Sequence, residues 1–389
     1  MPATAGRQRP CAGEARPAEG PAPETPASAA GPHPARTAPA GDNGTVTWPD
    51  APESSGSPEA PGSPEAPGSP EAPGSPEAPG SPGLAGLAGL AGLRPRLPSP
   101  VQEVVDERFE RHGVRLVLKR DDLIHPELIG NKWRKLAPSL AAAEGRTVVT
   151  FGGAYSNHLR ATAAAGRLLG LRTVGVVRGH ELRDRPLNGS LARCAADGMR
   201  LHFVERSVYR RKTEPGTLAA VLRDAGAGED AYVVPEGGSN ALAVRGCRAL
   251  GEELAGVADV AAVACGTGGT LAGMAAGLAP GARALGVPVL KGGFLHREVE
   301  ALQTAAFGGP AGDWSLDDRF HFGGYARTTP ELDAFAADFE DRHGVPVERV
   351  YVAKLLYGLV ALAEERAFRR GSTVAAVVTG RPFPEVPGP

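Results

Sequence analysis

The 389-residue chain has few cysteines, no excess of charge of either sign and no long apolar run. Its four cysteines, Cys11, Cys194, Cys247 and Cys265, lie far apart and form no CxxC pair. We therefore expect neither a disulfide framework nor a metal site, and a reducing compartment. Lys and Arg total 42 against 44 Asp and Glu, so no basic field is available to attract nucleic acid or an anionic membrane.

The amino terminus has no apolar signal-peptide segment. No stretch reaches the roughly 18 apolar residues that a membrane-spanning helix needs. We therefore expect a cytoplasmic protein that acts on a small molecule, with neither nucleic acid nor a membrane as its partner.

Residues 1–95 are rich in Pro, Ala, Gly, Ser and Glu. The segment GSPEAP occurs four times between Gly56 and Pro79, and a short Gly-Leu-Ala tract follows it. Proline at every third position blocks helix and sheet alike, and the apolar surface is too small to offset chain entropy. We predict a disordered low-complexity tail over residues 1–95.

From Leu97 onward, short β-branched runs alternate with amphipathic stretches, which predicts strands and helices in turn. The expected strands cover residues 114–119, 147–151, 172–178, 200–204, 231–234, 257–264, 284–290 and 373–378. The expected helices cover residues 132–143, 157–169, 189–197, 217–224, 241–254, 270–278, 296–306, 330–342 and 354–368. This alternation predicts an α/β fold with two lobes, built from open, mostly parallel sheets with helices on both faces. Ligands of such folds bind where loops leave the carboxyl ends of the strands.

The first candidate site is KRDDLIHPELIGNKWRKL, residues 119–136. Gly130 and Asn131 form a turn signal, so Lys132 begins a helix directly after a tight loop. The positive end of the helix dipole disfavours an ammonium there and lowers its pKa, which favours the neutral amine that Schiff-base chemistry requires. The pattern alone also fits an ordinary solvated lysine beside Arg134 and Lys135.

The second candidate is FGGAYSNHLRATAAAG, residues 151–166. A strand ends at Phe151, the two glycines permit a turn, and Ser156 is placed to cap the next helix. Backbone amides and a hydroxyl at that point could hold an anion or a phenolic oxygen. Ser156 also fits a simple helix cap, and His158 and Arg160 also fit a polar helix surface.

The third candidate is VAAVACGTGGTLAGMAAGL, residues 260–278. An apolar strand leads into a glycine-threonine loop and then a helix of small residues; the loop comprises Gly266, Thr267, Gly268, Gly269 and Thr270. Glycines let the main chain wrap a phosphate, while hydroxyls and helix amides supply donors. The loop is neither GxGxxG nor GxxxxGK[ST], so a mere tight turn is the alternative. PEGGSN, residues 235–240, is a similar but weaker strand-to-helix loop.

The C-terminal third adds Tyr325 in HFGGYARTT, Tyr351 in ERVYVAKLLYGL, and Thr379 at the end of the last strand. The chain has only six tyrosines, and two of them stand beside glycine or lysine motifs. Each tyrosine alone also fits a half-buried packing residue.

Taken together and in this order, KRDD, GNKWRKL, SNH and the glycine-threonine loop make the segment from about Leu97 to Thr379 resemble one enzyme family. It is similar to the D-cysteine desulfhydrase/1-aminocyclopropane-1-carboxylate deaminase family. The resemblance implies a fold type II enzyme, similar to the tryptophan synthase β-subunit, with pyridoxal 5'-phosphate between two lobes. We expect a large lobe of residues 96–134 and 238–389 and a small lobe of residues 135–237. Related enzymes are commonly dimers, so a homodimer is expected.

The resemblance also implies a role for each motif. Lys132 would hold the cofactor as a Schiff base and Asn157 would meet its phenolic oxygen, while Gly266, Thr267, Gly268, Gly269 and Thr270 would cup its phosphate. Ser156 would approach the substrate carboxylate or take part in proton transfer. Tyr325 and Tyr351 would form the pair of active-site tyrosines, and Thr379 would meet the pyridine nitrogen.

The implied reaction is that of a lyase and deaminase. A small amino acid loses its α-proton to Lys132, a β-substituent such as sulfide departs, and a 2-oxo acid and ammonia are released. D-cysteine or a related β-substituted amino acid is the expected substrate. A hydroxyl such as that of Thr379 leaves the pyridine nitrogen largely unprotonated, which suits β-elimination.

Two positions depart from the family's pattern. Val352 follows Tyr351, where the deaminases of the family carry glutamate and the desulfhydrases threonine. An aliphatic side chain contributes no charge there, so cyclopropane opening is the weaker expectation. Arg381 stands where a second glycine is usual. The alternatives are an amino-acid racemase or β-replacing synthase on the same fold, or a non-catalytic cofactor- or ligand-binding protein.

Overall fold

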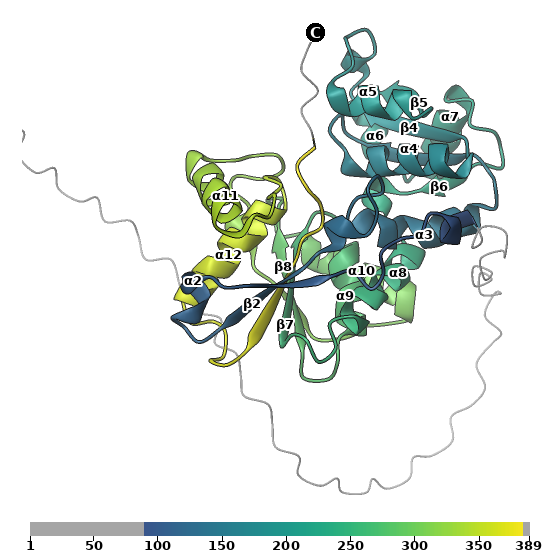
Figure 1. Ribbon diagram of the computed structural model, residues 1–389. Helices are drawn as coiled ribbons and strands as arrows, with labels where there is room; N and C mark the ends of the chain where they lie inside the picture. The colour runs from purple at the N-terminus through teal and green to yellow at the C-terminus, as the bar shows by residue number, and fades with distance from the viewer. Residues whose placement is uncertain (1–88, 384–389) are drawn as a thin grey trace, which may run out of the picture. The chain divides into compact units, whose positions relative to one another are not determined.

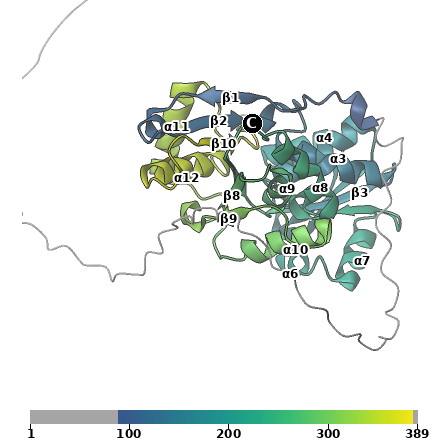
Figure 2. The same cartoon turned by 90° about the horizontal axis from the view of Figure 1, so that it is seen from below.

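The computed structural model describes residues 89–383, which form two sheets (Figures 1 and 2). The larger sheet has the strand order β1-β2-β10-β7-β8-β9, and the smaller has the order β5-β4-β3-β6. Every strand pair is parallel except β1 with β2. The expected α/β fold with mostly parallel sheets is therefore confirmed.

The strands expected from the sequence are all present, within three residues at each end. The large sheet contains β1 (Val101–Val104), β2 (Arg115–Lys119), β7 (Val260–Cys265), β8 (Arg283–Pro288), β9 (Trp314–Leu316) and β10 (Thr373–Val377). The small sheet contains β3 (Val148–Gly152), β4 (Thr173–Arg178), β5 (Arg200–Val204) and β6 (Tyr232–Val234). The sequence did not predict β1 and β9, because both are short edge strands whose hydrogen bonds depend on a distant neighbour.

Helices cover both faces of each sheet (Figure 1). On the large sheet, one face carries α2 (Glu107–Glu110), α11 (Pro330–His343) and α12 (Val352–Glu364), and the other carries α8 (Ala241–Glu252), α9 (Gly269–Gly277) and α10 (Leu295–Phe307). On the small sheet, one face carries α3 (Asn131–Ala143), α4 (Asn157–Leu169) and α5 (Gly189–Ala196), and the other carries α6 (Arg206–Arg210) and α7 (Pro215–Asp224). Short 3-10 turns span Asp121–Leu123, His180–Leu182, Glu236–Gly238 and Asp318–Phe320.

The central strand β7 shows why a continuous apolar run becomes a buried parallel strand. Its residues 260, 262 and 264 face the core formed with α11 and α12. Its residues 261, 263 and 265 face the core formed with α8 and α9. Because successive side chains point to opposite faces, a strand covered on both sides must be apolar throughout. The carboxyl end of β7 then delivers the glycine-threonine loop to the edge of the sheet.

The tail predicted for residues 1–95 falls outside the described residues as far as residue 88. Leu90 is only 6% exposed, and with Leu93 it packs into the apolar cluster around α3. Burying a leucine is favourable by about 1.5–3 kcal/mol. The chain therefore joins the core a few residues before the predicted boundary. None of the helices among residues 89–383 is both long and apolar enough to cross a membrane.

Candidate active site

A buried ion network fixes α3 against the large sheet. Arg134 on α3 contacts Asp121 at 2.9 Å and Glu253 at 2.8 Å, and Lys119 contacts Glu253 at 2.7 Å. Burial alone would raise the pKa of Glu253, but hydrogen bonds from Arg134 and Lys119 lower it to about 2. Removing one member would leave a buried unpaired charge, so the network enforces one geometry. The KRDD motif and Arg134 thus position the helix that carries Lys132.

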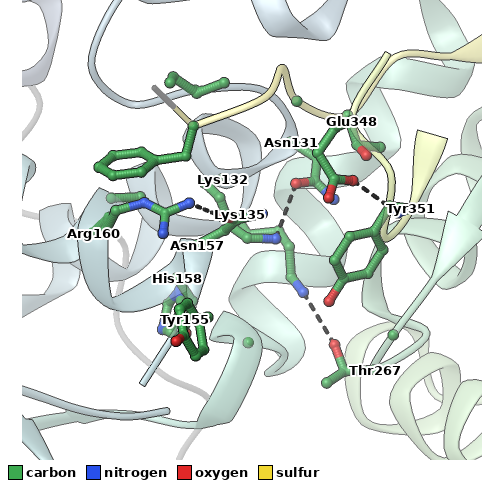
Figure 3. Close-up of a pocket in the computed structure, with 18 of the residues that line it drawn as sticks. Asn131, Lys132, Lys135, Tyr155, Asn157, His158, Arg160, Thr267, Glu348 and Tyr351 are labelled. Carbon is green, nitrogen blue, oxygen red and sulfur yellow. Dashed lines mark hydrogen bonds between the residues drawn. The ribbon is translucent and has the colours of Figure 1, made fainter. Parts of the chain in front are cut away.

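Lys132 is the second residue of α3 and lines a cavity of about 930 Å³ (Figure 3). Gly130, just before the helix, has a φ of 69°, and a Cβ on it would lie 1.6 Å from the backbone oxygen of Thr379. The N–H of Asn131 donates to that same oxygen at 3.4 Å. Only glycine therefore lets α3 begin directly against the segment that follows β10.

The Lys132 amine is poised to be neutral. Burial, and then the charge of Lys135, lowers its pKa to about 7. Nζ donates to Oδ1 of Asn131 at 3.0 Å, and Nδ2 of Asn131 donates to Thr270 at 2.9 Å. The main cause of the lowered pKa is burial, and not the helix dipole expected from the sequence. A neutral amine at physiological pH is the form that attacks an aldehyde carbon.

A second lysine in the cavity was not singled out from the sequence. Lys135 is 2% exposed, and its Nζ donates to Ser239 at 2.6 Å and to Thr267 at 3.3 Å. The hydroxyl oxygens of Ser239 and Thr267 are 2.5 Å apart. Burial lowers the pKa of Lys135 to about 8. The sequence signal that could have identified Lys135 is its spacing of three residues from Lys132, which places both lysines on one helix face.

The glycine-threonine loop completes a cradle of donors around Lys135. Gly268 has a φ of 78°, and a Cβ there would lie 2.7 Å from Val299. A Cβ on Gly269 would lie 2.7 Å from the Ser239 hydroxyl. The first amides of α9 have no acceptor within their helix. Together with one ammonium and two hydroxyls they form a donor set that contains no carboxylate, which suits a phosphate.

The start of α4 forms another part of the cavity wall. The Ser156 hydroxyl accepts the N–H of Leu159 at 3.2 Å, so Ser156 caps the helix as expected. Arg160 donates to Oδ1 of Asn157 and, at 2.7 Å, to Ser190. Because Oδ1 of Asn157 is engaged as an acceptor, its amide nitrogen is the end left to donate to a ligand. Arg160 therefore orients Asn157 rather than serving only as helix surface.

His158 is a core residue and not polar helix surface. It is 2% exposed, and its Nε2 lies 2.7 Å from the Thr150 hydroxyl. That hydroxyl donates to the backbone oxygen of Val234 at 2.8 Å, so Nε2 carries the proton and donates to Thr150. Burial, and then the charges of Lys132 and Lys135, lowers the pKa of His158 well below its usual value, so the ring is neutral.

The two candidate tyrosines meet at the opposite wall. The rings of Tyr325 and Tyr351 are 6.1 Å apart between centroids and meet edge to face at 71°. Tyr325 is 41% exposed, whereas Tyr351 packs against the loop, 3.3 Å from where a Cβ on Gly266 would lie. Burial raises the pKa of Tyr325, and it raises that of Tyr351 well above its usual value. Both hydroxyls therefore keep their protons near neutral pH.

A half-buried carboxyl group in the cavity, that of Glu348, was missed from the sequence. Glu348 lines the cavity and accepts the N–H groups of Val350 at 2.8 Å and of Tyr351 at 2.7 Å. Burial raises its pKa. From the sequence, the absence of a charged residue at Val352, on the other side of Tyr351, predicted that no charge lies near this tyrosine. The available signal was an acidic residue just before a helix, where it can accept free amides.

Every site residue expected from the sequence lies at the wall of this one cavity: Lys132, Ser156, Asn157, Gly266, Thr267, Gly268, Gly269, Thr270, Tyr325, Tyr351 and Thr379. Arg381, one of the departures, also lines it and donates to the backbone oxygen of Pro126 at 2.9 Å. The cavity lies where strands β3, β7, β8 and β10 end, as expected for parallel sheets. No group of three His, Cys, Asp or Glu side chains that could hold a metal ion occurs within residues 89–383.

A half-buried, partly neutral lysine and a phosphate cradle line one cavity at the ends of two mostly parallel sheets. They define a class of enzyme that holds a phosphorylated aldehyde cofactor through a Schiff base. The family model described as "Pyridoxal-phosphate dependent enzyme" matches residues 97–380. The chain therefore belongs to the pyridoxal-phosphate dependent enzyme family, and pyridoxal 5'-phosphate is its cofactor. The residues present fit this group, since they offer a reactive amine at one end and phosphate donors at the other.

Individual relatives agree with this assignment. A bifunctional D-cysteine desulfhydrase/1-aminocyclopropane-1-carboxylate deaminase, mitochondrial, of Arabidopsis thaliana is 33% identical over 270 residues, which cover 64% of this chain and 67% of the relative. A D-cysteine desulfhydrase of Klebsiella pneumoniae is 29% identical over 306 residues, which cover 73% of this chain and 91% of the relative. The crystal structure of an ACC deaminase homologue has a TM-score of 0.62 at 27% identity, covering 77% of this chain and 95% of that one. The family resemblance and the fold type II architecture expected from the sequence are confirmed.

Proposed function

We propose that this enzyme is a lyase that deaminates a small β-substituted amino acid such as D-cysteine. With D-cysteine and water as reactants, the products are pyruvate, sulfide and ammonia. The observation that carries the proposal is the Lys132 amine, whose pKa of about 7 makes it reactive in the cavity that also holds the phosphate cradle. The names of the relatives supply the substrate class.

We assign each end of the cofactor to one set of residues. Pyridoxal phosphate, which Lys132 would hold between turnovers, would supply an electron sink that makes the α-hydrogen of a bound amino acid acidic. The loop of residues 266–270, with Lys135, would hold the phosphate, and Asn157, oriented by Arg160, would donate to the phenolic oxygen. Thr379, which lines the same cavity, would offer its hydroxyl to the pyridine nitrogen, and a hydroxyl partner would leave that nitrogen largely unprotonated, which favours elimination.

Protons are moved by the residues of the cavity wall. Nζ of Lys132 takes the proton from the substrate α-carbon, because its lowered pKa leaves a free lone pair near neutral pH. Tyr325 and Tyr351 remain protonated and therefore act as donors. Ser156 and the first amides of α4 hold the substrate carboxylate, since a helix N-terminus favours an anion.

We also retain the proposed large lobe, residues 96–134 and 238–389, and small lobe, residues 135–237. The membership of the two sheets supports this division, and α3 crosses the boundary between residues 134 and 135 and so connects the lobes. A homodimer, a cytoplasmic location and a lack of nucleic-acid binding complete the proposal. Light scattering on the purified protein tests the dimer directly.

The covalent link is tested with Lys132→Ala. The wild-type protein is expected to show a visible cofactor band, and borohydride reduction is expected to fix the cofactor on the peptide that contains Lys132. Lys132→Ala removes the only amine assigned to this role, so both signals are expected to vanish. Lys212→Ala, outside the cavity, is the control. A colourless wild-type protein, or a cofactor fixed on another lysine, would contradict the assignment.

The reaction is tested with a panel of D- and L-amino acids and 1-aminocyclopropane-1-carboxylate. Release of 2-oxo acid and ammonia from D-cysteine is the expected result, with less from the cyclopropane because Val352 is apolar. Recovery of the amino acid with inverted stereochemistry and without keto acid would identify a racemase. Exchange of its β-substituent would identify a synthase. A bound cofactor without any turnover would favour a binding protein.

A further inference from the structure

The loop that carries Tyr325 has an unusual backbone. Four of its residues have positive φ: Phe322 at 51°, Gly323 at 88°, Gly324 at 121° and Ala326 at 54°. Two of these are not glycine, and residues with a Cβ rarely adopt this conformation. Such a segment persists only where its surroundings over-determine it. The loop must therefore be held by contacts outside itself.

Lys354 on α12 supplies the main contact. Its side chain is 0% exposed, and Nζ donates to the backbone oxygens of His321 at 2.9 Å and Gly324 at 2.8 Å. One oxygen belongs to the residue just before the strained segment, and the other belongs to a residue within it, immediately before Tyr325. Each of these oxygens also accepts one backbone N–H, from Gly324 at 3.0 Å and from Arg327 at 3.2 Å. An apolar group in place of the ammonium would leave each carbonyl with that single donor and would remove the link between the loop and α12.

A neighbouring residue of the same helix supports the same loop. The ring of Tyr357, one turn after Lys354, meets Phe322 edge to face with centroids 4.9 Å apart. Tyr351 immediately precedes the helix, and its N–H is held by Glu348 at 2.7 Å. A single helix therefore sets the position of both tyrosines.

The presence of a charge at this position requires an explanation. Among the ion pairs of residues 89–383, none includes Lys354. Burial lowers its pKa to about 8, and Glu348 opposes this change. A buried ammonium without a partnering carboxylate is unfavourable, and an apolar side chain of similar length would fill the space at lower cost. The ammonium is explained by the two carbonyls that it holds.

We propose that Lys354 is the positioning residue of the tyrosine pair. Its ammonium ties the strained loop to α12 and so holds the Tyr325 hydroxyl opposite Tyr351 and Lys132. The catalytic consequence rests on the proposed function of the tyrosines. The ordering of the loop does not, and it can be measured separately.

Loop ordering is measured by hydrogen exchange of the holoenzyme. In Lys354→Met, which keeps the length but removes the donor, amides of residues 321–327 should exchange about tenfold faster, while β7 and β10 stay protected. Lys354→Arg keeps a donor and should fold and show a smaller increase. Gln303→Met is the control, since the fully buried Gln303 holds the carbonyls of Ala272 at 3.1 Å and Ala311 at 2.6 Å elsewhere. The proposal is overturned if exchange of residues 321–327 is unchanged in Lys354→Met. It is also overturned if Gln303→Met speeds exchange of these same residues by an equal factor.

The catalytic consequence is measured by a double-mutant cycle with Tyr325→Phe. Lys354→Met should lower kcat/KM about 100-fold through misplacement of Tyr325, while the cofactor band and cofactor affinity stay unchanged. In the Tyr325→Phe background it should have little further effect, because the two changes remove one function. If the double variant instead loses kcat/KM by the product of the two single factors, Lys354 does not act through Tyr325. A cofactor band that survives in Lys132→Ala would instead refute the proposed function and leave the exchange result standing.

Discussion

At the scale of single residues, three lysines share one physical feature. Lys132, Lys135 and Lys354 are held by the fold in places where an ammonium is poorly solvated, and burial lowers their pKa values to about 7, 8 and 8. Each lies within reach of hydroxyl or carbonyl oxygens rather than a carboxylate. Their charge can therefore be given up, or directed at a ligand, more readily than that of a surface lysine.

This feature predicts how the stability of the cofactor-free protein depends on pH. The pKa of Lys132 is about 7 in the folded protein against 10.5 for a solvated lysine, so between these pH values the unfolded chain binds more protons. Stability therefore rises as the pH increases from about 7 to about 10, and this group adds no slope below that window. Lys132→Met removes the contribution of this amine to the pH dependence of stability. We therefore expect a higher free energy of unfolding near pH 7 and a smaller increase of that free energy with pH.

Urea titrations of the cofactor-free protein near pH 7 and near pH 9 measure this slope. The exposed Lys291→Met serves as the control variant. If Lys132→Met keeps the full wild-type rise between the two pH values, the amine is not desolvated in the way that the structure indicates.

At the scale of elements, the site depends on where helices begin. Gly130 places the first turn of α3 against Thr379, Gly268 turns the chain into α9, and Ser156 begins α4. These starts could be predicted, because caps and glycine turns are local signals. The contacts among them could not, since each start touches residues far away in the sequence.

We expect Gly130→Ala to separate Lys132 from the rest of the site. Its Cβ would meet a backbone oxygen at 1.6 Å, and that oxygen cannot move without shifting the end of β10. Cofactor affinity should fall by at least about tenfold, because a shift of even 1 Å in a reacting group is costly. Absorbance titration of the cofactor-free protein measures the affinity.

Gly145→Ala, at the other end of α3, is the matched control. Gly145 also has a positive φ, of 82°, but a Cβ there would meet nothing within 4 Å. It should lower stability by about 1 kcal/mol through backbone strain and leave cofactor affinity unchanged. Equal loss of cofactor affinity in both variants would mean that strain, and not the clash with Thr379, is responsible.

At the scale of the whole molecule, the fold brings the ends of two sheets to one cavity. Loops of both sheets line this cavity. Ser156 and Asn157 come from the small sheet, and Thr267 and Thr379 come from the large sheet. Neither sheet alone carries both the amide of Asn157 and the glycine-threonine loop, because Asn157 follows β3 of the small sheet and the loop follows β7 of the large sheet. This is the physical reason why the motifs are spread over more than 240 positions, from Lys132 to Thr379.

Truncation tests how much of the chain this arrangement needs. Deleting residues 1–88 should leave kcat/KM unchanged, since residues after 88 supply the lysine, the glycine-threonine loop and the two tyrosines of the cavity wall. Deleting residues 1–95 should also remove Leu90 from the cluster around α3 and lower stability by about 1.5–3 kcal/mol. Loss of activity on removing residues 1–88 alone would show that the segment contributes to function.

The sequence by itself determined the alternation of strands and helices, the two parallel sheets and the motifs at the strand ends, because periodicity and turn residues act locally. It also pointed to Lys132 and to the residues that surround it. Only the tertiary structure decided that Lys135, Glu348 and Lys354 belong with them. Their importance arises from desolvation by segments distant in sequence, and no local pattern reports how deeply a charge will be buried.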